Sequence, residues 1–292
     1  MCRRLYLHRS AALLALLLAG SAFGQDFTTP RPSPGAKVVQ TVGTTELSVS
    51  YSRPGVKNRV IWGGLVPWGK AWRTGANEIT QFQCADDVWV EGQKLAAGTY
   101  AVVTTPDSIA AWTVAFSTQK DMARLTGYDP KSNVLTVPVR PVQAGYVERM
   151  QFTFDDPGMD SVTLTLRWDK LAVPLRIKVD TNGKTLAAAR TAVAAAKPDD
   201  WRTPYRAASW AFDAGVAPDE TAKWANAAAK VKPNFQTSGL LARMAAKNGD
   251  MKQATTLMKK SIAFGRADST LEKAQVDGNE KLLAEWSAPK KK

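Results

Sequence analysis

Histidine and cysteine are almost missing from this 292-residue sequence. Histidine occurs once, at His8, and cysteine occurs only at Cys2 and Cys84. Ser-His-Asp and Cys-His catalysis both need an imidazole base, a structural zinc site needs several Cys or His ligands, and a disulfide needs two thiols. Beyond residue 8 the sequence therefore excludes all three, and we expect neither a metal site nor a cofactor.

The first 24 residues are typical of a cleavable signal peptide. Three arginines form a basic N-terminal region: Arg3, Arg4 and Arg9. The apolar run Ser10–Gly20 follows and is too short to span a bilayer. Ala22 and Gly24 are small residues suited to cleavage after Gly24, and Cys2 precedes the run, where it cannot be a lipidation site. We expect a periplasmic or secreted chain that loses His8 and has no stable membrane span.

The one remaining thiol lies in a strand-like stretch. Cys84 is in phase with Phe82 in "ITQFQCADDVWV", and no basic neighbour in sequence would lower its pKa. We interpret it as a buried structural thiol; a reactive thiol is the alternative.

Basic residues exceed acidic ones. The formal net charge of +13 falls to +10 without the three leader arginines. Residues 288–292 form a basic tail that ends in Lys290–Lys292, and the remaining charge is spread along the chain. Such a balance permits binding to anionic polymers or membrane surfaces. No nucleic-acid-binding pattern is present, so nucleic acid is not an expected partner.

Residues 37–180 alternate apolar and polar side chains with period two, after a linker at residues 25–36. Leu47, Val49 and Tyr51 form one such apolar face. About nine short strands without a long helix between them predict an antiparallel β-sandwich or barrel. "DDPGMD", Asp155–Asp160, lacks the spacing of a calcium-binding EF-hand loop and predicts a hairpin turn.

The pattern changes at Asp180–Gly183, the predicted domain boundary, so the fold class is α+β with segregated domains. Alanine-rich, helix-forming sequence over residues 184–287 predicts six helices: Lys184–Lys197, Pro204–Ala214, Pro218–Val231, Phe235–Asn248, Met251–Phe264 and Thr270–Trp286. Gly215 and Gly249 are 34 residues apart, the period of tetratricopeptide repeats. "LLARMAAKNGDMKQATTLMKKSI" resembles that family well, and the preceding unit does so loosely. Either the helices bind a protein partner, or they only cap the β-domain.

The β-half carries a second resemblance. The segments that carry it are "YSRP" (Tyr51–Pro54), Lys57 with Arg59, "IWGGLVPWG" (Ile61–Gly69), "WRTGANE" (Trp72–Glu78), "LAAGTY" (Leu95–Tyr100) and "WTVAF" (Trp112–Phe116). Over Ser33–Val179 the chain resembles the bacterial family known as domain of unknown function 2911 (DUF2911). Asn58 stands where glycine is more usual in that family, and Trp68 where tyrosine is. The resemblance implies a secreted β-domain and no accepted catalytic role.

Between Arg53 and Glu78, cations and tryptophans are concentrated. The candidate ligand-binding residues are Arg53, Arg59, Trp62, Trp68, Trp72, Arg73, Asn77 and Glu78. Arginine captures carboxylate or phosphate and stacks on aromatic rings, so one interpretation is a pocket for an anionic or carbohydrate ligand. The other is a structural clasp, in which a buried Arg73–Glu78 pair or Asn77 satisfies the polar groups of an irregular crossover.

These observations predict a non-enzymatic extracytoplasmic binding module. The β-domain would recognise a ligand or an envelope component, and the helices would bind a protein partner. The alternative is a carboxylate-dependent hydrolase of envelope polysaccharide that uses Glu78 with Glu148 or Asp87.

Overall fold

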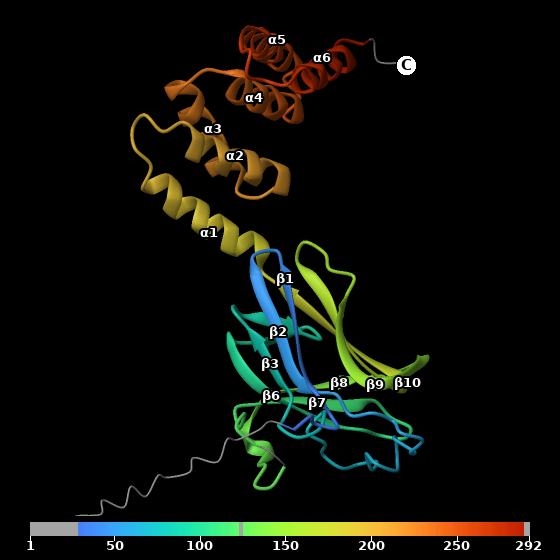
Figure 1. Ribbon diagram of the computed structural model, residues 1–292. Helices are drawn as coiled ribbons and strands as arrows, with labels where there is room; N and C mark the ends of the chain where they lie inside the picture. The colour runs from blue at the N-terminus through green and yellow to red at the C-terminus, as the bar shows by residue number, and fades with distance from the viewer. Residues whose placement is uncertain (1–28, 123–124, 289–292) are drawn as a thin grey trace, which may run out of the picture. The chain divides into compact units, whose positions relative to one another are not determined.

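The computed structural model describes residues 29–122 and 125–288 (Figure 1). The chain divides into two units after Pro32, and every described strand and helix belongs to the second unit. Antiparallel sheets occupy residues 35–179, and helices follow over residues 181–287, which confirms the α+β class. The predicted signal peptide, its cleavage site and the final lysines lie outside the described residues.

The described strands form two antiparallel sheets. The first contains six strands in the order β1-β2-β3-β6-β7-β8: β1 Gly35–Val42, β2 Thr45–Ser52, β3 Gln81–Cys84, β6 Gly98–Thr105, β7 Trp112–Ser117 and β8 Asn133–Val139. The second contains four strands in the order β5-β4-β10-β9: β4 Val88–Val90, β5 Gln93–Leu95, β9 Val142–Asp155 and β10 Ser161–Val179. A short 3₁₀-helix, η1 Pro130–Ser132, precedes β8.

Side chains from both sheets share one apolar core, so the β-half is a sandwich; the described strands do not close into a barrel. Leu47, Val49 and Tyr51 of β2 point into this core as their alternation predicts. Cys84 is also buried there, 2% exposed, and its thiol donates to the carbonyl of Ala96 at 3.3 Å. The prediction of a buried thiol is confirmed.

β10 is one continuous strand of 19 residues, which contains both apolar stretches Val162–Trp168 and Leu175–Val179. The register against β9 shifts on either side of Asp169, which has a positive φ of 54°. Such a bulge bends a strand without ending it, so β10 continues through Asp169–Leu171.

The first sheet also buries part of its outer face. Ala101 and Val103 of β6 and Ala115 of β7 form a second, smaller cluster with Ile79, and Met122 packs against it. The connection between β7 and β8 runs over this face, and the N–H of Ile79 bonds to the carbonyl of Met122 at 3.1 Å. β6 therefore buries apolar side chains on both faces, because Met122 and its neighbours cover the face opposite the main core.

Six α-helices follow in the described chain: α1 Thr181–Ala194, α2 Arg202–Ala214, α3 Pro218–Val231, α4 Phe235–Lys247, α5 Met251–Ala267 and α6 Lys273–Ser287. The first starts three residues before its predicted start because Asp180 acts as the N-cap, its side chain accepting from the N–H of Gly183 at 2.8 Å. Lys184 of α1 in turn forms an ion pair with Asp86.

The helices pack in sequence order, α2 against α3 and α4 against α5. Gly215 and Gly249 both end the first helix of a pair with positive φ, 69° and 83°. Ala208 and Ala242, also 34 positions apart, are both completely buried. The 34-residue spacing therefore corresponds to two similar hairpins, and membership of the tetratricopeptide family stays a prediction.

We predict that the Cys84 thiol makes stability depend on alkaline pH. Burial raises the pKa of this thiol to about 11, above the value of about 8.5 of an unfolded chain. Between pH about 8.5 and about 11 the folded state therefore keeps the thiol proton, which the unfolded state releases. The stabilisation is complete below pH about 8.5 and is lost as pH rises towards 11.

The measurement is the free energy of unfolding in urea across this pH range for the wild type and Cys84→Ala. The variant should be less stable at neutral pH, and the gap should narrow as pH rises. A gap that stays constant would contradict the prediction.

Candidate functional site

The segment between β2 and β3, residues 53–80, crosses the end of the sandwich and pairs with both sheets. Gly55 forms an isolated bridge with Arg149 of β9 in the second sheet. Trp72 forms another with Thr104 of β6 in the first sheet, through reciprocal bonds of 2.8 and 2.9 Å. The crossover is therefore fixed at two points, one on each sheet.

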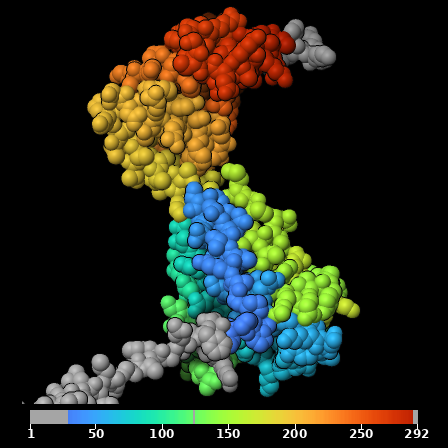
Figure 2. Space-filling view, in the orientation of Figure 1, coloured from blue at the N-terminus to red at the C-terminus, as the bar shows by residue number. Residues whose placement is uncertain are grey.

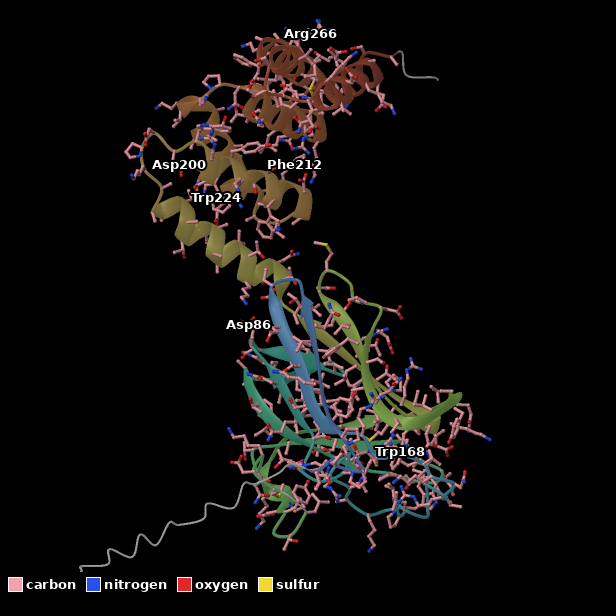
Figure 3. All side chains as sticks on the ribbon, viewed as in Figure 1. Asp86, Trp168, Asp200, Phe212, Trp224 and Arg266 are labelled. Atoms are coloured by element: carbon pink, nitrogen blue, oxygen red, sulfur yellow. The ribbon has the colours of Figure 1, made fainter. Side chains whose placement is uncertain are left out.

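Five tryptophans form a cluster, three from the crossover and one each from β7 and β10. Trp62 contacts Trp72, Trp112 and Trp168, with ring centroids 4.7–5.8 Å apart. Trp72 stacks on Trp168 at an interplanar angle of 19°, and Trp68 meets the edge of Trp112. Figure 3 shows Trp168 in a dense region of side chains, towards the opposite end of the β-half from Asp86. Trp112 and Trp168 are fully buried, and Trp68 reaches the surface.

Two of these indoles are imperfectly satisfied. The N–H groups of Trp62 and Trp168 are buried and have no hydrogen-bond acceptor among the described residues. Leaving a buried donor without a partner costs about 1–3 kcal/mol. Contacts between the rings must outweigh that cost, since aromatic pairs contribute beyond their buried area. The tryptophans therefore close the end of the sandwich by packing against one another.

Both arginines at the start of the segment are held by neutral groups. Arg53 donates from Nε to the carbonyl of Met150 at 3.0 Å and from Nη2 to the side-chain oxygen of Gln151 at 3.2 Å. Arg59 donates to two carbonyls of its own turn at 3.0 and 2.6 Å. These bonds fix the guanidinium groups without neutralising their charge.

Asn77 ties the segment to the start of the β-half. Its side-chain amide donates to the carbonyl of Ser33 at 2.9 Å and to the hydroxyl of Ser52 at 3.2 Å. Its φ of 55° lies in the left-handed region, which asparagine tolerates better than most residues. In this geometry Asn77 acts as a clasp.

Thr74 and Thr80, which the sequence did not single out, form the polar centre of the clasp. Thr74 is 1% exposed, and its hydroxyl donates to the carbonyl of Val102 and exchanges a bond with the hydroxyl of Thr104, both at 2.9 Å. Thr80 donates to the carbonyl of Thr74 at 2.7 Å. Thr74 has φ 56°, an outlier for a β-branched residue, and its sequence gives no signal of this.

Arg73 and Glu78 differ in exposure. Arg73 is half-buried, whereas Glu78 is exposed and borders a shallow hollow of about 300 Å³ together with Ser50 and Gln81. Backbone groups of the crossover are satisfied by the side chains of Arg59, Trp72 and Thr80 and by the bridges to the two sheets.

The two carboxylates suggested as partners of Glu78 have other contacts. The Tyr146 hydroxyl, which donates to Glu148, and a backbone N–H lower the pKa of that carboxyl. Lys94 and a backbone N–H lower the pKa of Asp87. A general acid at neutral pH needs a raised pKa, so neither carboxyl suits that role. The hydrolase hypothesis stays a prediction that depends on Glu78.

Within residues 29–122 and 125–288, no three His, Cys, Asp or Glu side chains gather closely enough to hold a metal ion. No helix in these ranges is long and apolar enough to cross a bilayer.

The candidate residues are thus divided between two environments. Arg53, Trp62, Trp72 and Asn77 contact other parts of the β-half, while Trp68 lies at the surface. Lys57, Arg59 and Lys70, which follow Arg53 on the same crossover, are also exposed. The buried side chains of the crossover thus form a structural clasp, and its exposed side chains are cationic and in part apolar. That this surface binds a ligand stays a prediction.

We predict that Thr74→Val lowers the free energy of unfolding by about 1–3 kcal/mol, because it removes a buried hydroxyl and leaves the Val102 carbonyl without its donor. Chemical denaturation measures the change. Thr136→Val in β8, where the threonine is exposed, is the matched control and should change stability by less than about 0.5 kcal/mol. Equal effects of the two substitutions would show that the buried network contributes nothing specific.

Comparison with known proteins bears on the β-half alone. The model of the family described as "Protein of unknown function (DUF2911)" matches residues 33–177. No curated protein and no solved structure matches the chain. The match covers the whole crossover, its two sheet contacts and the tryptophan cluster. Through this β-half the chain belongs to the DUF2911 family.

Proposed function

We propose that this chain is a non-catalytic binding protein of the cell envelope. Its β-half recognises an anionic envelope component through the β2–β3 crossover, and its helices offer a separate surface to a protein partner. One observation supports this most directly: no Asp or Glu occurs between Leu47 and Asn77, while the same stretch contains five cations, Arg53, Lys57, Arg59, Lys70 and Arg73.

Two of these cations, Arg53 and Arg59, are held in position by the fold. Arg53 and Arg59 donate to carbonyl and amide oxygens, which orient the guanidinium groups but carry no opposing charge. Lys57 has φ 51° and an exposed side chain. Charges held in position by the fold attract an anion without the full entropic cost of ordering them on binding.

The helical half supports the second part of the proposal. Where α2, α3 and α4 meet, Phe212, Val216 and Met244 line a small pocket of about 130 Å³. The cations of Arg243 and Lys247 lie 5.4 and 5.0 Å from the Phe212 ring centroid. An apolar pocket with a cationic rim suits an apolar side chain of a partner protein that is followed by a carboxylate.

Export is part of the proposal and follows from the N-terminal sequence. The basic region, the short apolar run and the small residues before Gln25 are typical of a signal peptide. A chain without histidine beyond residue 8 also fits a binding role better than acid–base chemistry.

We predict that the double substitution Lys57→Glu and Lys70→Glu weakens binding to immobilised dextran sulfate at least about thirtyfold, since each cation near an anionic surface contributes on the order of 1 kcal/mol and about 1.4 kcal/mol is a factor of ten in affinity. The salt dependence of binding should fall in parallel. Retention by the polyanion, measured over a salt series, gives both quantities.

The matched control is Lys259→Glu with Lys260→Glu, two exposed lysines of α5 with the same change in net charge. If this control loses as much affinity as the crossover variant, binding reflects total charge, and the crossover is not the recognition surface.

A further inference from the structure

Four large apolar side chains are exposed on two neighbouring loops of the β-half. Val60 is 74% exposed, Leu65 46% and Trp68 38% in the β2–β3 crossover, and Ile109 is 91% exposed in the turn between β6 and β7. We name these four residues the apolar tips. Isolated apolar residues at a surface are ordinary, whereas several on adjacent loops mark an interaction site.

Backbone contacts hold the two loops together. The N–H of Leu65 bonds to the carbonyl of Val60 at 2.9 Å, which closes the first loop. The N–H of Gly69 bonds to the carbonyl of Pro106 at 2.8 Å and joins that loop to the turn that contains Ile109. The tips are therefore carried by one connected structure, whose crossover residues lie at the surface of the β-half in the sky-blue region of Figure 2.

The base beneath the tips is rigid. Trp68 packs on Trp112, whose indole N–H donates to the carbonyl of Asp107 at 2.9 Å. A Cβ on Gly63 would lie 2.2 Å from the Trp68 ring nitrogen, so this ring lies directly on the glycine. The fold thus holds Trp68 in place at the surface, with its ring only partly covered.

Charged residues flank the apolar tips along the same loops. Lys57 and Arg59 precede Val60, and Lys70 follows Trp68, all three with exposed side chains. Two carboxylates lie nearby. Asp107 accepts from the N–H groups of Ile109 and Ala110 at 2.8 and 2.7 Å, and Glu148 accepts from the N–H of Lys57 at 3.2 Å. With Arg53 and Arg73 included, the loops still carry a clear excess of positive charge.

We infer that the envelope component recognised by this surface is an anionic lipid bilayer, into which the apolar tips insert while the cations contact lipid phosphates. This rests on the proposed function and specifies its partner. Separate protruding side chains suit a deformable lipid surface better than a rigid protein groove. A tryptophan at the level of the headgroups and lysine or arginine beside it are the residue types that proteins place at the membrane interface.

The test is cosedimentation of the full chain, purified from the periplasmic fraction of a bacterial host, with vesicles of equal parts phosphatidylglycerol and phosphatidylcholine, and with vesicles of phosphatidylcholine alone. We expect binding to the anionic vesicles. Val60→Ser with Ile109→Ser should lower the partition coefficient at least about tenfold, because two well-exposed side chains lose their transfer into lipid.

The matched control is Val39→Ser with Val134→Ser. These two valines are 51% and 53% exposed and lie on β1 and β8, outside the two loops. The control should change the partition coefficient less than about twofold. All variants share the same N-terminus, so differences between them report on the loops.

Insertion is measured separately from adsorption. Ile109→Cys adds an exposed thiol to the described residues, whose other thiol, Cys84, is buried, and it can be labelled with an environment-sensitive fluorophore in the exported chain. On anionic vesicles its fluorescence should be quenched by nitroxide-bearing lipids. The same label at Thr256→Cys, on an exposed position of α5, should not be quenched.

The outcomes separate the two proposals. Unchanged vesicle binding in the apolar double variant, or an unquenched label at position 109, overturns the lipid inference. If dextran sulfate binding nevertheless depends on Lys57 and Lys70, the proposed function stands with a different anionic partner. A chain that binds neither vesicles nor the polyanion refutes both.

Discussion

The contact between Trp72 and Trp168 is the interaction on which the end of the sandwich depends. Trp72 belongs to the crossover and bonds through its backbone to β6, whereas Trp168 belongs to β10 of the opposite sheet. Their stacked rings therefore join the two sheets at a place where the backbone is irregular. Trp62 meets both rings edge-on and completes the packing. Burial of large aromatic area in one place compensates for the backbone and indole groups that this end satisfies poorly.

The tryptophan cluster also explains how the crossover is held in place on its buried side while its outer side is exposed. Its buried side consists of tryptophans and threonines with many contacts, and its outer side consists of cations and apolar tips. Strained backbone is tolerated where the surroundings hold it in place. Lys57, Asn58, Thr74 and Asn77 all have positive φ in this one segment. The concentration of strain in a segment that also carries the exposed cations supports a functional interpretation of its surface.

Sequence reasoning predicted the fold well where periodicity is local. The alternation in β2, the turn after β9 and the hairpins around Gly215 and Gly249 all follow from patterns within a few residues. It was less successful where a distant segment decides the outcome. The covered outer face of β6 depends on the connection between β7 and β8. The bulge at Asp169 depends on the pairing with β9.

The candidate site shows the same limit. The sequence pointed to charged and aromatic residues, and it did identify the segment that spans the two sheets. The structural role of Thr74 was not predicted, because it depends on a positive φ and on burial of the side chain, and the presence of a threonine in a sequence indicates neither. Asn58, by contrast, is explained by the structure. Its φ of 58° lies in the left-handed region, which both asparagine and glycine adopt, so either residue fits this position.

The two bridges of the crossover have a consequence for how this domain can diversify. Gly55 and Trp72 are fixed to different sheets, so the residues between them form a loop whose ends are set by the fold. Lengthening such a loop lowers the free energy of unfolding only slightly, since each doubling of the loop length costs about 0.6 kcal/mol of closure entropy. Inserted residues are therefore tolerated at the exposed positions Gly64 and Leu65, whereas Ile61, Trp62 and Val66 must keep their packing against the core.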